Sequence, residues 1–223
     1  MKDIAIVLLS GGLDSCVTAA IAAQSFDLAL LHATYGQRTQ NREFQAFSNI
    51  ADYYGVPTNK RRTVTLDYLS DLGGSALTDV RSPVPHADLE NKQVPVTYVP
   101  FRNAHLLCLA VSWAEILKAR AVYIGVVQED GSGYPDCTVD FCTAFAQAIR
   151  LGTHPNHHID LITPIIGKNK AEIVKIGQLL NAPLHLTWSC YQNDDRACGI
   201  CDSCALRLRA FKQAGLTDPI PYQ

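Results

Sequence analysis

The chain has 223 residues, of which 48% are apolar and 18% are charged, and its net charge at neutral pH is −2. This length suits one domain with at most a small appendage, because domains usually hold roughly 100–200 residues. The composition excludes a disordered chain, and the near-neutral charge argues against a protein that coats nucleic acid. No apolar run reaches the ~18 residues of a membrane span, and the acidic Asp3 makes the N-terminus a poor signal peptide. We therefore expect a cytoplasmic protein without membrane contact.

Short aliphatic runs alternate with helical stretches along the chain. The expected strands are 4–9, 28–33, 63–66, 121–127 and 159–162, and the expected helices are 15–24, 41–54, 103–119, 139–149 and 170–180. This alternation is typical of a parallel α/β sheet that is covered by helices on both faces. Residues 67–95 contain Gly73-Gly74, three prolines and mixed charge. We expect them to form a long surface loop of functional importance.

The sequence Ser10-Gly-Gly-Leu-Asp-Ser15 joins the first predicted strand to the first predicted helix. Two glycines allow a close backbone approach to a ligand, and the helix N-terminus directs N–H groups and a positive dipole end at it. The two serine hydroxyls add donors, so the turn suits phosphate or pyrophosphate, with Mg²⁺ between the phosphate and Asp14. It is neither a Walker sequence nor G-x-G-x-x-G. The structural alternative is a Gly-Gly turn with a serine or aspartate that caps the helix.

Four of the eight cysteines, Cys190, Cys198, Cys201 and Cys204, fall within a short C-terminal stretch. Four thiolates at this spacing predict a tetrahedral Zn²⁺ site that is structural, because no coordination position stays open. A redox dithiol, an iron–sulfur cluster and chance core cysteines are the alternatives. The segment could also be a zinc ribbon that grips nucleic acid through Arg207 and Arg209, but we expect these arginines to be solvated surface charges.

Three further motifs stand where predicted strands end or a helix begins: Tyr35-Gly-Gln-Arg38, Val99-Pro-Phe-Arg-Asn103 and Ser132-Gly-Tyr-Pro-Asp-Cys137. Open parallel sheets bind ligands at such strand ends. The SGGLDS turn resembles the pyrophosphate loop of the N-type ATP pyrophosphatases. Together with Thr187-Trp-Ser-Cys-Tyr191 and the cysteine set, the motifs resemble the QueC family of 7-cyano-7-deazaguanine synthases from Ile4 to Tyr222.

The resemblance implies an adenine nucleotide alpha hydrolase-like domain of Rossmann-like α/β architecture over residues 1–185. Residues 186–223 would form a zinc-binding segment packed on it, and the protein would be a homodimer. The implied reaction converts 7-carboxy-7-deazaguanine, ammonia and ATP to the nitrile, through an adenylated carboxylate and an amide. Because 223 residues leave no room for a glutaminase domain, free ammonium should suffice.

The resemblance also implies roles for individual residues. ATP would bind Leu9, Ser10, Gly11, Gly12, Leu13, Asp14 and Ser15. Catalysis would involve Asp14, Arg38, Arg102, Lys168 and Lys170, because cations stabilise the charge on the phosphates. The base would be recognised by carboxylates and an aromatic ring, and the expected substrate-binding residues are Gln37, Arg38, Arg102, Asn103, Glu129, Asp130, Tyr134 and Asp136. We expect Cys137 and Cys142 to be buried packing residues rather than nucleophiles.

Two positions depart from the family pattern and leave alternatives open. Thr39 stands where family members usually carry histidine, and Gly131 where an aromatic residue is common. One alternative is a QueC-like ligase that joins the deazaguanine carboxylate to an amine of a protein or nucleic acid. An RNA-sulfurating pyrophosphatase and a catalytically silent zinc-ribbon RNA binder are further alternatives.

Overall fold

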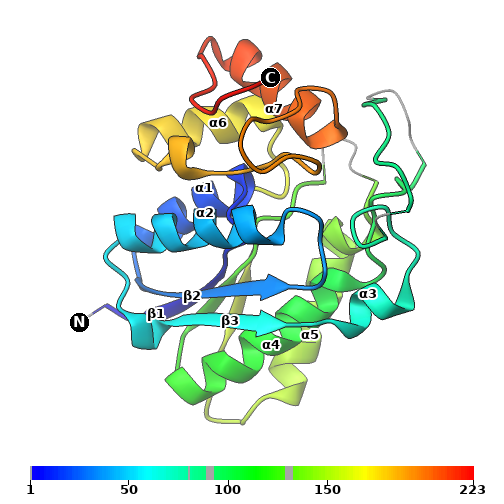
Figure 1. Ribbon diagram of the computed structural model, residues 1–223. Helices are drawn as coiled ribbons and strands as arrows, with labels where there is room; N and C mark the ends of the chain where they lie inside the picture. The colour runs from blue at the N-terminus through cyan, green and yellow to red at the C-terminus, as the bar shows by residue number, and fades with distance from the viewer. Residues whose placement is uncertain (1, 80, 89–92, 129–132) are drawn as a thin grey trace.

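The computed structural model describes residues 2–79, 81–88, 93–128 and 133–223. Its centre is one parallel five-stranded sheet in the order β3-β2-β1-β4-β5 (Figure 1). The strands are β1 (Ile4–Leu8), β2 (Asp27–Thr34), β3 (Arg61–Thr65), β4 (Ala121–Tyr123) and β5 (Asp160–Ile162). The helices are α1 (Leu13–Ala23), α2 (Gln40–Tyr53), α3 (Tyr68–Leu72), α4 (Arg102–Leu117), α5 (Val139–Gly152), α6 (Lys170–Leu179) and α7 (Asp202–Ala214). The predicted α/β fold is confirmed.

Helices cover both faces of the sheet, which is why its central strands are apolar throughout. Ile6 and Leu8 of β1 face the layer formed by α4 and α5, whereas Ala5 and Val7 face α1 and α2. Side chains along a strand alternate between the two faces, so a doubly covered strand needs apolar residues at every position. Figure 1 shows α6 and α7 on the α1 side, and α6 packs against both α1 and α7.

Strand β4 is shorter than the predicted 121–127, and the residues that follow it, Ile124 and Gly125, line the cavity described below. After Tyr123 the Ile124 N–H still donates to the Ile162 carbonyl at 3.1 Å, and Gly125 then lies against α1. A Cβ at Gly125 would stand 2.8 Å from Thr18 Oγ1 and 3.0 Å from the carbonyl of Asp14. This close approach leaves no room for a side chain just after the strand.

Two other expectations need correction. The predicted loop 67–95 contains a short helix, α3, whose Leu69 is buried. Arg207 is not a solvated surface charge: only 2% of its side chain is exposed, and it pairs with Asp218 at 2.8 Å. The surrounding segment supplies enough acceptors to make burial of the guanidinium possible. Cys137 and Cys142 are buried, as predicted, and no helix in the described ranges is long and apolar enough to cross a bilayer.

Candidate active site

A cavity of about 620 Å³ opens at the C-terminal ends of the central strands. Its walls include Leu9 after β1, Tyr35 after β2 and Gly125 after β4. The predicted site residues that line it are Leu9, Ser10, Gly12, Leu13, Asp14, Ser15, Gln37, Arg38, Arg102, Asn103, Tyr134 and Lys170. Lys168 is exposed and lies outside the lining, as do Gly11 and Asp136. Glu129, Asp130 and Gly131 fall outside the described residues.

The glycine loop has the conformation of an anion-binding turn. Gly12 precedes the first residue of α1, so the free N–H groups of the helix face the cavity. Ser10 Oγ accepts from the Gly12 N–H at 3.2 Å and lies 3.1 Å from Ser15 Oγ. Ser15 Oγ donates to the Gly12 carbonyl at 3.0 Å, so these contacts hold both hydroxyls at the N-terminus of α1, where a phosphate would bind.

Gly11 has no substitute in this loop. Its φ is +91°, and a Cβ would stand 2.6 Å from the carbonyl oxygen of Glu43 and 2.9 Å from Ala46 Cβ. Its own carbonyl accepts from the Trp188 N–H at 2.8 Å. The loop is therefore held between α2 and the C-terminal segment.

We expect Gly11→Ala to weaken ATP binding at least ten-fold, because the backbone must move away from α2 to admit the methyl group. The conformational strain should cost about 1–3 kcal/mol of stability. Gly73→Ala is the matched control, since Gly73 has a φ of +72° but meets nothing within 4 Å. Titration calorimetry with a non-hydrolysable ATP analogue measures the affinity. An unchanged affinity in Gly11→Ala would show that the loop tolerates the displacement.

Asp14 and Lys170 both line the cavity and form an ion pair. Lys170 is the first residue of α6, which begins with a capping box formed by Asn169 and Glu172. Asp14 Oδ2 contacts Lys170, while its Oδ1 is buried and has no hydrogen-bond partner among the described residues. A buried carboxylate oxygen without a partner is costly, and it fits the hard oxygen ligand that Mg²⁺ requires. The predicted Mg²⁺ role of Asp14 thus has a suitable donor.

Arg102 also lines the cavity, from the first position of α4. Its Nη1 donates to the Tyr35 hydroxyl at 2.8 Å, and the guanidinium lies 5.3 Å from the centroid of the same ring. The contact fixes the guanidinium beside the cavity, where it can face a ligand of negative charge. Tyr134 is anchored separately, with its hydroxyl 2.9 Å from Thr97 Oγ1.

Asn103 donates two hydrogen bonds to Asp136. The Asn103 N–H donates to Asp136 Oδ2 at 2.9 Å, and its side-chain amide donates to the Asp136 carbonyl at 3.0 Å. Burial raises the pKa of Asp136, and the N–H of Asn103 opposes that rise. The carboxylate thus satisfies a free N–H in the first turn of α4. Recognition of the base by Asp136 stays a prediction.

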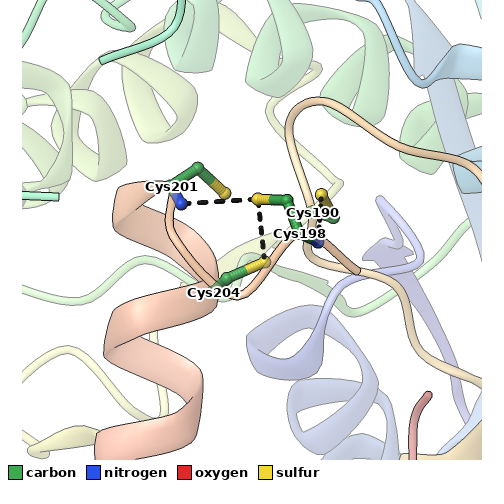
Figure 2. A group of neighbouring side chains, drawn as sticks. All are labelled: Cys190, Cys198, Cys201 and Cys204. Carbon is green, nitrogen blue, oxygen red and sulfur yellow. Dashed lines mark hydrogen bonds between the residues drawn. The ribbon is translucent and has the colours of Figure 1, made fainter. Parts of the chain in front are cut away.

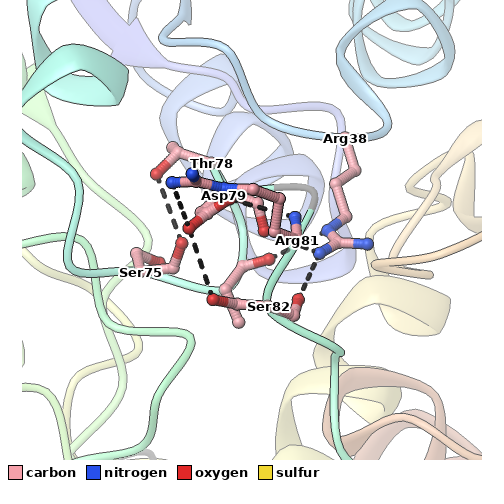
Figure 3. Close-up of polar contacts among 7 residues, drawn as sticks. Arg38, Ser75, Thr78, Asp79, Arg81 and Ser82 are labelled. Carbon is pink, nitrogen blue, oxygen red and sulfur yellow. Dashed lines mark hydrogen bonds and ion pairs between the residues drawn. The ribbon is translucent and has the colours of Figure 1, made fainter.

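Arg38 forms hydrogen bonds to a segment next to the cavity, from which Leu77 lines the cavity wall. Its guanidinium donates to the carbonyls of Asp79 and Ser82 (Figure 3). It also donates to the Ala76 carbonyl at 2.9 Å, and the Arg38 N–H donates to the Leu77 carbonyl at 3.1 Å. The side chain therefore holds Ala76, Asp79 and Ser82 together next to the site. Its predicted part in catalysis stays a prediction.

The four cysteines converge as predicted, although they come from a loop and from the start of α7 (Figure 2). Their sulfur atoms all lie within 4.8 Å of one another. Backbone N–H groups of Gln192, Asn193 and Cys198 point at Cys190 Sγ at 3.3–3.4 Å. Donors aimed at sulfur stabilise a thiolate, and four such ligands fit Zn²⁺.

Sequence reasoning missed two residues at this site. Trp188, which is 1% exposed, docks the C-terminal segment on the phosphate loop through its backbone. Its place in the Thr187-Trp-Ser-Cys motif was the available signal. Glu43 lines the cavity from the first turn of α2. A lone glutamate on an amphipathic helix indicates a solvated position, so the sequence held no signal for it.

A parallel α/β sheet, a glycine-rich turn at the start of α1, a cavity at the strand ends and a four-cysteine cluster together define a fold of the PP-loop class. The family model described as "Queuosine biosynthesis protein QueC" matches residues 4–215. The chain belongs to the QueC family.

Relatives of known name match almost the whole chain. A 7-cyano-7-deazaguanine synthase of Chlorobium phaeobacteroides is 54% identical over 98% of this chain and 96% of its own. A protein of the same name from Chloroherpeton thalassium is 52% identical with the same coverage. Among solved structures, an NMN synthetase from Francisella tularensis is 15% identical, with a TM-score of 0.50 over 97% of this chain and 78% of its own. The last similarity supports the fold alone.

Proposed function

We propose that this chain is an ATP-dependent ligase that converts 7-carboxy-7-deazaguanine and ammonia to 7-cyano-7-deazaguanine in queuosine and deazapurine biosynthesis. The observation that carries the proposal is the match to synthases of that name over nearly the full length of both chains. The cavity supports it, because a phosphate loop and two cations converge at the strand ends where such a reaction needs them.

The chain's own residues account for the activation step. The substrate carboxylate attacks the α-phosphorus of ATP, and pyrophosphate leaves into the N–H groups around Gly12. Lys170 and Arg102 face the charge that spreads over the phosphates. Asp14 would hold the Mg²⁺ that accompanies ATP, and the ion would neutralise phosphate charge. Ammonia then displaces AMP to give the amide, and a second activation followed by elimination gives the nitrile.

The C-terminal segment 186–223 forms part of the cavity wall, with Trp188, Ser189 and Tyr191 among the lining residues. Cys190, Cys198, Cys201 and Cys204 would hold a structural Zn²⁺, which would fix the segment on the domain formed by residues 1–185. Four reduced thiols suit the cytoplasm, where disulfides are rare. We also propose a homodimer, on the strength of the family.

Asp14→Ala is expected to abolish product formation, because it removes both the metal ligand and the partner of Lys170. The experiment is mass spectrometry of a reaction containing protein, ATP, Mg²⁺, 7-carboxy-7-deazaguanine and ammonium. A nitrile formed by the wild type and lost in the variant supports the proposal. An amide as the final product would instead favour transfer to a different amine. No deazaguanine-dependent ATP turnover by the wild type would refute it.

A further inference from the structure

Glu43 is a cavity-lining carboxylate to which the reaction described above gives no part. It lies in the first turn of α2, directly behind the phosphate loop, since its main-chain oxygen limits the space at Gly11. Oε1 accepts from the Thr39 hydroxyl at 2.9 Å, and Oε2 accepts from the Gln37 amide at 3.0 Å. The Tyr35 N–H fixes Gln37 in turn by donating to its Oε1 at 2.8 Å. The carboxylate is thus held in one orientation by neutral donors.

The surroundings of Glu43 suit a proton acceptor. In the parts of the chain that the structure describes, no Lys, Arg or His nitrogen pairs with its carboxylate. Among the described residues each oxygen accepts one side-chain hydrogen bond, so lone pairs stay available for a ligand. Burial raises the pKa of Glu43, while the donors Gln37 and Thr39 and the Arg102 charge lower it, and the Asp194 charge raises it further. A carboxyl group above its ordinary range is a better base near neutral pH.

Amide formation needs such a base. When ammonia attacks the adenylated carboxylate, its lone pair forms the C–N bond and leaves a positively charged nitrogen. One N–H proton must leave before the carbonyl reforms and the C–O bond to AMP breaks. We infer that Glu43 takes this proton from the attacking nitrogen. The inference rests on the proposed function and adds the base to it.

The variant Glu43→Gln distinguishes a role of Glu43 in amide formation from a role in the adenylation that precedes it. ATP–pyrophosphate exchange that depends on 7-carboxy-7-deazaguanine reports adenylation, and it should stay within about two-fold of wild type. Amide formation from ammonium should fall by about 10²–10⁴-fold, the usual range for a general base. Hydroxylamine should restore turnover as the hydroxamate, because its more acidic adduct loses a proton to water. Glu115→Gln, on the far end of α4 and outside the cavity lining, is the matched control.

The outcomes distinguish failure of the inference from failure of the proposed function. A wild type without exchange or amide formation refutes the proposed function. A wild type that works beside a Glu43→Gln variant with full amide synthesis overturns the inference. Loss of exchange in that variant also overturns it, because Glu43 would then act in binding or adenylation.

A second variant keeps the inference testable if Glu43→Gln does not fold. Thr39→Val retains the carboxylate but removes a donor that lowers the pKa of Glu43. The base must be deprotonated to act, so the acidic limb of the amide-formation pH profile should move to higher pH. An unchanged limb in a folded Thr39→Val enzyme would contradict a role for Glu43 as the base.

Discussion

Asp218→Asn is expected to lower the free energy of unfolding by about 3–5 kcal/mol, the usual cost of breaking a buried ion pair on one side. The side chains of Arg207 and Asp218 are 2% and 4% exposed. Arg207 Nε and Nη2 each donate to an Asp218 oxygen, at 2.8 and 3.0 Å. The substitution leaves a guanidinium charge in the interior without its counter-charge. Urea denaturation followed by circular dichroism measures the change.

Asp52→Asn is the matched control because Asp52 pairs with Arg61 at the surface, where 66% of its side chain is exposed. Exposed pairs contribute about 0–1 kcal/mol, so this variant should unfold almost as the wild type does. If both variants lost the same free energy of unfolding, the surroundings of Arg207 would have to relax or admit water after Asp218→Asn.

The buried pair also bears on the active site. Arg207 Nη1 donates to Thr187 Oγ1 at 2.7 Å, and Nη2 donates to the Leu184 carbonyl at 3.3 Å. The next residue after Thr187 is Trp188, whose N–H holds the carbonyl of Gly11. Helix α7 is therefore connected to the phosphate loop through two hydrogen-bonded steps.

The fold was predictable because its signals are local. Buried parallel strands are apolar throughout, and amphipathic helices separate them, so the strands and the main helices follow from the sequence. The glycine loop and the four-cysteine site could also be predicted from the sequence, since the residues of each motif are contiguous or closely spaced. The ends of the strands were harder to predict, since the close approach of Gly125 to α1 just after β4 is encoded in no local pattern.

Roles that depend on distant partners could not be predicted. The sequence indicates a cation at Arg38, but not the three carbonyls of residues 76–82 to which it donates. The burial of Arg207 likewise depends on Asp218 and Thr187, which lie on either side of it along the chain. Glu43 lines the cavity only because Gly11 lets α2 approach the loop.

Cys204→Ser is expected to lose the zinc that we propose for the cysteine cluster and to lower the melting temperature by more than about 10 °C. Structural zinc contributes many kcal/mol of apparent folding free energy in small sites, and each kcal/mol shifts the melting temperature by roughly 2–4 °C in a chain of this size. ATP should also bind more weakly, because the released segment no longer holds Trp188 against Gly11. Metal analysis, calorimetric melting and ATP titration below the melting temperature measure the three effects.

Cys108→Ser is the matched control, because Cys108 is exposed and takes no part in the cluster. It should keep its zinc, its melting temperature and its affinity for ATP. A Cys204→Ser protein that loses zinc and stability but binds ATP as tightly as the wild type would show that the loop keeps its shape without Trp188. The zinc segment would then stabilise the fold alone. A loss of ATP affinity in proportion to zinc content would show that the cysteine cluster sets the geometry of the phosphate loop.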